Sequence, residues 1–282
     1  MKKAVSVKNI LRTGSSLPAA VQTEDGGIIL VKLSGSGDGA VASVTEWIAS
    51  HVGILAGLPL LMPSLVRIES GLANTTDDGE LRELIRSSEG INLCFPFLTH
   101  ASECSAEESL VLGPDIFYYD CFLLNTDRHG RHTNCLVSDE GMFSTDYGVS
   151  FLIRGILEGK NYDTNMQILS HMCRSPLRKT SGDWTHIMKM MTCIGKEKTD
   201  AIIDSIPDEW LRNLPGKETN PRERLKAGIA DACRNTERMS AVLGAVSAIG
   251  EFDEEKHKKQ QKEQRDAFVR GLKEESRYCK LS

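Results

Sequence analysis

Polar side chains that could do chemistry are concentrated in residues 125–134, which read Asn-Thr-Asp-Arg-His-Gly-Arg-His-Thr-Asn. Asp-Tyr-Gly follows at residues 146–148. In a loop between a helix and a strand, Asp127 could accept a proton from a hydroxyl group and orient it as a nucleophile. Asn134 and Asp146 offer the hard oxygen ligands that Mg²⁺ prefers. These residue types in this order are typical of phosphoryl transfer, although each alone is also common in turns.

A phosphoryl-transfer site also needs a cation for the phosphates, and Lys32 is the candidate. It lies in the most strand-like segment, between Val31 and Leu33, where burying a lysine is costly unless it is paired. Glu46 lies in the next predicted helix. Its neighbours three and four positions away are all small: Ala42, Ser43, Ala49 and Ser50. Because small residues let another element approach, we expect Glu46 to reach Lys32. The alternative is an edge-strand lysine and a solvated glutamate.

The elements that must position these residues follow from hydrophobic periodicity and turn signals. Residues 5–11, 18–23 and 27–33 predict an antiparallel meander whose second turn contains Asp-Gly-Gly. Residues 40–56 carry an apolar stripe with helical spacing. The other predicted strands are 64–68, 91–98, 135–137 and 142–144, and the other predicted helices are 77–87, 115–124, 164–173, 183–193, 196–205, 208–214 and 221–249. The order predicts an α+β fold, β-rich over 1–98 and helical over 99–250.

Composition narrows the class of protein. The chain has 282 residues, 40% of them hydrophobic, and a net charge of −5, which allows a buried core and disfavours nucleic-acid binding by the chain itself. No apolar run approaches the ~20 residues that span a bilayer, and no apolar segment follows Met1-Lys2-Lys3, so we expect no membrane attachment or secretion. Eight scattered cysteines without a Cys-x-x-Cys pair favour reduced thiols in the cytoplasm. The highly charged residues 251–282 predict an exposed helix or tail.

The order of Lys32, Glu46, the loop from Asp127 to Asn134, and Asp-Tyr-Gly at 146–148 resembles a protein-kinase-like fold. The motif Asn-Thr-Asp-Arg-His, followed by a short loop to Asn and then Asp-Tyr-Gly, resembles the HipA-like kinases. Within that family it resembles a small stand-alone branch of about this length. Two other segments also resemble that branch: Arg-Thr-Gly-Ser-Ser-Leu-Pro at 12–18 and Ile-Pro-Asp-Glu-Trp-Leu at 206–211. The resemblance covers about residues 8–240.

The resemblance implies a two-lobed fold and a role for each matching residue. Lys32 would hold the ATP phosphates with Glu46 as its partner, and Asp127 would be the catalytic base. Asn134 and Asp146 would bind Mg²⁺. The remaining implied positions are a phosphate-covering loop containing Gly14, Ser15 and Ser16 and an adenine-contacting hinge at residues 95–98, which includes Phe97 and Leu98. Ser15 and Ser16 are candidate autophosphorylation sites, with an ordinary polar turn as the alternative.

The resemblance also implies a protein Ser/Thr acceptor, a toxin or effector role, and an antitoxin or other regulatory partner. Two departures stand out. Ordinary protein kinases place the metal-binding Asn five residues after the catalytic Asp, where this chain has His132, and Asn134 comes at plus seven. No Gly-x-Gly-x-x-Gly covers the phosphates. These departures leave open a nucleotide-binding pseudokinase or regulatory module without useful catalysis. A third possibility is a kinase for a lipid or small-molecule hydroxyl, because Asp-Arg loops also occur in such kinases.

Overall fold

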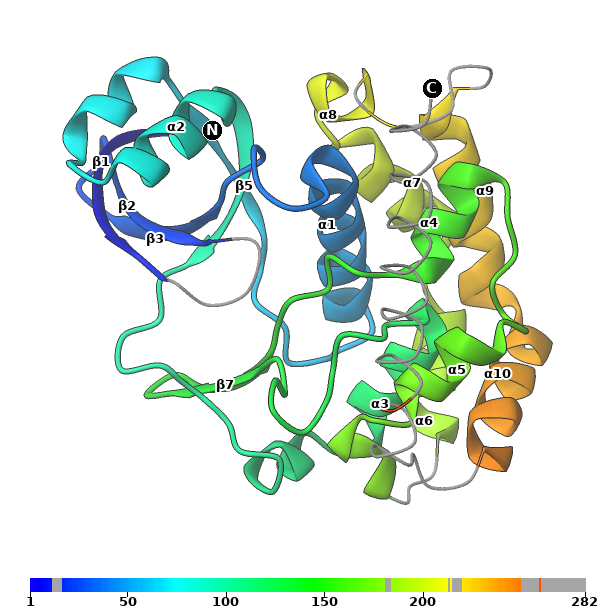
Figure 1. Cartoon of the computed structure of the whole chain (residues 1–282). Helices are drawn as coiled ribbons and strands as arrows, with labels where there is room; N and C mark the ends of the chain where they lie inside the picture. Colours follow the sequence, from blue (N-terminus) through cyan, green and yellow to red (C-terminus); the bar gives the residue numbers. More distant parts are fainter. Residues whose placement is uncertain (12–16, 181–183, 213, 215–219, 250–258, 260–282) are drawn as a thin grey trace, which may run out of the picture. The chain divides into compact units, whose positions relative to one another are not determined.

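The computed structural model describes residues 1–11, 17–180, 184–212, 214, 220–249 and 259 (Figure 1). Gly14, Ser15 and Ser16 lie outside the described residues, and so does the predicted charged tail apart from Lys259. Residues 1–248 form one compact unit in which strands and helices are mixed. The predictions for the phosphate-covering loop and for the tail therefore stay predictions.

Five strands near the N-terminus close a barrel (Figure 1). They are β1 (Lys2–Ile10), β2 (Ala19–Thr23), β3 (Ile28–Lys32), β4 (Ser64–Ile68) and β5 (Gly90–Pro96), in the order β1-β2-β3-β5-β4. The antiparallel pairing of β1, β2 and β3 confirms the predicted meander. In β3, Ile29 and Val31 enter the barrel core. Because successive side chains of a strand alternate between its two faces, Lys32 lies on the face opposite Val31.

Helix α1 (Gly39–Leu55) follows β3 and is buried along most of its length. Its apolar stripe packs into the helical part of the unit. Trp47 Nε1 donates hydrogen bonds to Ile202 O at 3.3 Å and to Ser205 Oγ at 3.1 Å, which ties α1 to α7 (Lys196–Asp204). Gly53 is required by close packing, because a Cβ there would lie 2.8 Å from Leu60 Cδ2. Helix α1 is therefore held rigidly from several sides, and so is Glu46 within it.

A second sheet holds the segment with the candidate catalytic loop. Its strands are β6 (Ser102–Glu103), β7 (Cys135–Ser138) and β8 (Gly141–Ser144), all antiparallel. The strand pair β7–β8 was predicted, and the two-residue β6 was not. Helix α3 (Gly113–Leu123) precedes the loop and ends at Leu124 in a left-handed conformation, with φ of 52°. The loop at 125–134 therefore joins a buried helix to β7, the central strand of a small sheet.

Helix α2 (Gly79–Ser87) and the 3₁₀ turn at Ser70–Thr75 pack on the barrel, and Leu72, Leu81 and Ile85 join its core (Figure 1). The remaining helices belong to the helical part of the unit: they are α4 (Phe151–Glu158), α5 (Met166–Met172), α6 (Thr185–Thr192), α8 (Asp208–Arg212), α9 (Pro221–Arg234) and α10 (Thr236–Ala248), with 3₁₀ turns at Glu108–Leu112 and Pro176–Lys179. Helix α8 reaches the barrel, because Trp210 Nε1 donates to Ile91 O at 2.7 Å. No helix in the described part of the chain is long and apolar enough to cross a membrane. The cysteines that are described are all free thiols.

One prediction of an element was wrong. The single helix expected over 221–249 is two helices, because the chain leaves the helical conformation at Asn235, with φ of −83° and ψ of 80°. Asn235 Oδ1 accepts a hydrogen bond from the backbone N–H of Arg238 at 2.9 Å and so starts α10. The chain changes direction at this break. The break depends on a local N-cap, which hydrophobic periodicity does not predict.

Candidate active site

Lys32 is the centre of a buried group of charges. Its ammonium donates to Glu46 Oε2 at 2.6 Å and to Asp146 Oδ1 at 2.7 Å. The three side chains come from β3, from α1 and from the segment after β8. Burial alone would lower the pKa of Lys32, but the two carboxylates raise it above its usual value. Lys32 therefore stays charged although only 17% of its side chain is exposed.

The contact that the sequence predicted between Lys32 and Glu46 is present, and the small-residue face of α1 explains it. Glu46 is only 2% exposed. The Asp-Tyr-Gly segment lies against the same face: a Cβ placed on Gly148 would be 3.6 Å from Ala42 Cβ and 3.8 Å from Glu46 Oε2. The backbone N–H of Tyr147 also bonds to the Glu46 carboxylate. Glu46 thus links the lysine of β3 to the segment that carries Asp146.

Asp127 and Asn134 meet at the two ends of the candidate loop. Asn134 Nδ2 donates to Asp127 O at 3.1 Å and to Asp127 Oδ2 at 3.4 Å. Both Asn134 and Asp146 have positive φ, 50° and 61°, in the left-handed region that asparagine and aspartate tolerate better than most residues. Burial raises the pKa of Asp127, and the nearby charge of Asp146 raises it further. The interaction shows that the two carboxylates share one site.

Asp146 has a different electrostatic environment from Asp127. The ammonium of Lys32 lowers the pKa of Asp146, against the effect of burial. The Asp146 side chain is 43% exposed, so it is open on one side. The pKa values of the two carboxylates are therefore shifted in opposite directions, so Asp127 takes up a proton more readily than Asp146 does.

Sequence reasoning gave no role to Arg128, the residue that organises the loop. Arg128 is 1% exposed, and its Nε donates to Asp120 Oδ2 of α3 at 2.7 Å. Its Nη1 donates to Thr133 O and, at 3.0 Å, to Asn134 O, and its Nη2 donates to Ser144 Oγ at 2.8 Å. One guanidinium therefore joins α3, both ends of the loop and the end of β8. The available signal was an aspartate, Asp120, inside the otherwise apolar helix predicted at 115–124.

The donor set suits a magnesium ion that is held mainly by a phosphate substrate. Asn134 uses its Nδ2 in hydrogen bonds, which leaves its Oδ1 as a ligand, and the Lys32 contact uses only one oxygen of Asp146. Among the described residues no group of three or more His, Cys, Asp and Glu side chains is placed to hold a metal ion. Two protein ligands are nevertheless enough, because phosphates and water commonly complete the coordination shell of Mg²⁺. The residues present fit the ion.

The predicted hinge, residues 95–98, spans the end of β5 and the two residues after it. Leu98 is 8% exposed and Phe97 is 37% exposed. The ring centroid of Phe95 lies 5.9 Å from Lys32 Nζ. The structure thus brings Lys32, Glu46 and Asp146 together and joins Asp127 to Asn134. Gly14, Ser15 and Ser16 lie outside the described residues.

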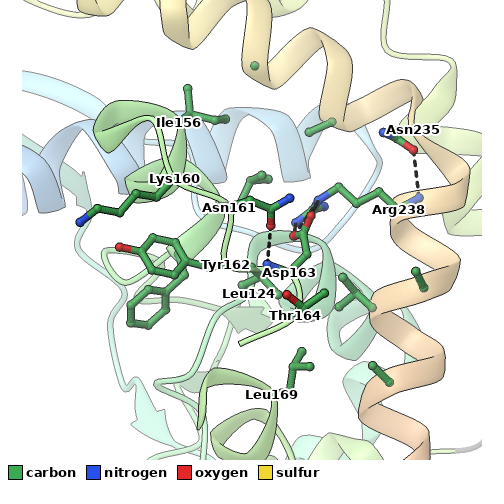
Figure 2. Close-up of a pocket in the computed structure, with 18 of the residues that line it drawn as sticks. Leu124, Ile156, Lys160, Asn161, Tyr162, Asp163, Thr164, Leu169, Asn235 and Arg238 are labelled. Atoms are coloured by element: carbon green, nitrogen blue, oxygen red, sulfur yellow. Dashed lines mark hydrogen bonds and ion pairs between the residues drawn. The ribbon is translucent and has the colours of Figure 1, made fainter. Parts of the chain in front are cut away.

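A cleft of about 970 Å³ lies elsewhere, between α4, α9, α10 and the chain from α4 to α5 (Figure 2). Leu124 lines this cleft. The five candidate site residues do not line it: Lys32, Glu46, Asp127, Asn134 and Asp146. Its polar wall is an ion pair in which Arg238 Nη2 donates to Asp163 Oδ1 at 2.7 Å. Because Arg238 also donates to Phe122 O at 3.1 Å, this pair ties α10 to α3. The pair therefore has a structural role.

Comparisons with known proteins identify the family of the chain. The family model described as HipA-like kinase matches residues 4–237. No curated protein matches the chain. Among solved structures, the crystal structure of a Helicobacter pylori proinflammatory kinase, CtkA, is similar with a TM-score of 0.48 and 12% identity, over 88% of this chain and 99% of that one. The family match confirms the resemblance read from the motifs, and the chain belongs to the family of HipA-like kinases.

Proposed function

We propose that this kinase transfers the γ-phosphate of ATP, bound with Mg²⁺, to a serine or threonine hydroxyl of a protein. The observation that carries the proposal is the convergence of Lys32, Glu46 and Asp146 beside the pair of Asp127 and Asn134. Phosphoryl transfer needs little covalent chemistry from the protein. It needs positioned cations, oxygen ligands for a metal and one group that orients the nucleophile.

Lys32 would bind the phosphates. A lysine ammonium has three donors, and Glu46 and Asp146 take two of them. The third N–H is left for a phosphate oxygen. Glu46 would keep the ammonium in place when the Asp146 carboxylate binds a metal ion. Bound Mg²⁺ would supply charge neutralisation at the β- and γ-phosphates, held by Asn134 Oδ1 and the carboxylate of Asp146.

Asp127 would act on the acceptor. As the acceptor oxygen forms its bond to the γ-phosphorus, the bond from phosphorus to the bridging oxygen breaks and ADP leaves. The acceptor proton passes to the Asp127 carboxylate, whose raised pKa makes it a better base than an exposed aspartate. Asn134 orients that carboxylate through the contact to Oδ2. The positioning of Asp127 thus depends on the loop that Arg128 holds.

The family supports the finer parts of the proposal. We assign residues 1–98 and 99–250 to two lobes, with the adenine contacting the backbone at Phe97 and Leu98. The acceptor would be a protein in the cytoplasm, and a regulatory partner such as an antitoxin would control a toxin or effector activity. Each of these assignments is implied by membership of the family.

Calorimetry tests the nucleotide site. Wild type should bind ATP with Mg²⁺, and removal of Mg²⁺ by EDTA should weaken binding at least tenfold. Lys32→Met should abolish binding, and Asp146→Asn should remove the Mg²⁺ dependence. Lys189→Met, on the exposed face of α6, is the matched control and should bind as wild type does. Equal binding by Lys32→Met and wild type would contradict the proposal. Binding without phosphate transfer would favour a pseudokinase.

A further inference from the structure

The candidate loop ends in a short turn that the proposed reaction does not use. His129 and His132 close it: the N–H of His129 donates to His132 O at 2.9 Å, and the N–H of His132 donates to His129 O at 3.1 Å. Gly130 and Arg131 form the exposed tip of this His129–His132 turn. A two-residue tip accounts for the spacing of seven between Asp127 and Asn134, two more than ordinary kinases have. The extra residues thus have a defined structure and position.

The base of the His129–His132 turn is fixed on both sides. On one side is Arg128, which is buried and bonded to α3. On the other side the N–H of Thr133 donates to Glu103 Oε1 at 2.8 Å, and Thr133 Oγ1 donates to Cys104 O at 2.8 Å. A turn with a rigid base and an exposed tip presents its side chains to a ligand at little conformational cost.

The tip carries the positive charge of the Arg131 side chain. Within the described ranges of the chain, the side chains of Arg131 and His132 have no hydrogen-bond or ion-pair partner. Glu103 is the acid next to the turn, and its carboxylate accepts the Thr133 N–H. Burial lowers the pKa of His129, the interactions with Arg174, His132 and Arg131 lower it further, and Glu103 raises it, so these side chains lie close to one another. The chain as a whole has a net charge of −5, which makes a local cationic group notable.

The cationic tip lies beside the proposed catalytic carboxylate. His132 is close enough to Asp127 for its charge to lower the pKa of that carboxyl, against the larger effect of burial. Arg131 is four residues after Asp127, at a distance on the order of 10 Å, because four residues that fold back in a turn cover less than the ~3.3 Å per residue of an extended chain. An extended acceptor peptide would cover that distance in about three residues.

We propose that the His129–His132 turn is an acceptor-recognition element, in which Arg131 and His132 bind an acidic side chain two to four residues from the phosphorylated hydroxyl of a protein acceptor. The inference rests on the proposed function, since it places the acceptor hydroxyl at Asp127. An arginine fork and an imidazole N–H suit a carboxylate or a phosphorylated side chain. A nucleic acid fits less well, because the cationic group is small and the chain is acidic overall.

A panel of serine-centred peptides tests the proposal. Each peptide carries Asp, Ala or Lys at one position from four residues before to four residues after the serine, and the full-length chain is assayed with labelled ATP and Mg²⁺. Wild type is compared with Arg131→Glu and with Arg67→Glu, an exposed residue of β4 that serves as control. ATP hydrolysis without peptide and the melting temperature are measured for all three proteins.

Wild type and the control should prefer Asp over Lys at one or two of these positions by about fivefold in kcat/KM, mainly through KM, since exposed charge pairs are weak individually. The preference should shrink as ionic strength rises. Arg131→Glu should reverse it, with ATP hydrolysis and melting temperature unchanged.

Three outcomes overturn the proposal. With ATP hydrolysis intact, the proposal fails if wild type does not prefer acidic peptides, which includes the case that no peptide is phosphorylated. It also fails if Arg131→Glu keeps the preference for acidic peptides. It also fails if phosphatidylserine vesicles, but not acidic peptides, are bound through Arg131. If wild type does not hydrolyse or transfer phosphate from ATP at all, the proposed function fails and the inference falls with it.

Discussion

Arg128→Met is the substitution that most sharply tests how the site is built. Arg128 and Asp120 are 1% exposed each, and their ion pair has an N–O distance of 2.7 Å. Methionine has a similar length and no charge, so the variant leaves the Asp120 carboxylate buried, and among the described residues only Asn125 Nδ2, at 2.9 Å, still donates to it. Removal of one partner from a buried ion pair costs about 3–5 kcal/mol. We therefore expect the free energy of unfolding to fall by about that amount.

Urea denaturation of the variant and of wild type measures this change, provided that both unfold in one step. Activity should fall as well, because the loop loses its bonds from Arg128 to Thr133 O, Asn134 O and Ser144 Oγ. ATP affinity measured without Mg²⁺ should change little, since the ammonium of Lys32 is held by Glu46 and Asp146 and not by the bonds of Arg128. The double variant Asp120→Leu with Arg128→Met removes both charges and should regain part of the lost stability.

A loss below about 1 kcal/mol in Arg128→Met would refute this reasoning, because the pair would then not be the anchor of the loop. Equal instability of the single and double variants would also count against it, since the unpaired carboxylate is the stated cause of the loss. If ATP affinity fell together with stability, Arg128 would act on the whole site and not on the loop alone.

Three further predictions test other parts of the molecule. Glu46→Gln should weaken ATP binding about tenfold by calorimetry, because a hydrogen bond to a charged group is worth about 1.5–3 kcal/mol, and unchanged affinity would mean that Lys32 does not need its partner. The pKa of Asp25 is lowered to about 2, first by the hydroxyl of Thr23. The stability that this shift contributes is complete above pH 3.8 and is lost as the pH falls toward 2. Thr23→Val should raise the pKa of Asp25 toward 3.8 in an NMR titration. Ser150→Ala removes the N-cap of α4 and should cost about 1 kcal/mol in thermal unfolding, whereas an unchanged melting temperature would contradict that role.

Several features of the site could be predicted because they depend on local sequence. Lys32 between two apolar residues of a strand needed a partner, and the small residues around Glu46 showed which helix face could approach it. Asp127 and Asn134 lay in a segment with clear turn chemistry between a helix and a strand. The strands β1, β2 and β3 alternate or are continuously apolar, and their connecting turn has Asp-Gly-Gly.

Other features depend on contacts between distant residues or on local exceptions. The parallel pairing of β1 with β4 closes the barrel across more than 50 residues, and the sequence of neither strand predicts this pairing. The Arg128 group joins residues from 120 to 147, so its burial follows only from the fold. Helix α4 was not predicted, and Gly155 within it lowers helix propensity. That glycine is needed because a Cβ there would lie 2.5 Å from Lys160 O.

The central claim is that Asp127 serves the transfer of phosphate and not the binding of nucleotide. The most direct test follows labelled γ-phosphate from ATP to protein, with mass spectrometry to place it, for wild type and Asp127→Asn. Both proteins should bind ATP with Mg²⁺ with similar affinity, and transfer to serine or threonine should fall at least a hundredfold in Asp127→Asn. Equal transfer by the two proteins, or loss of ATP binding in the variant without a change in folding, would contradict the account.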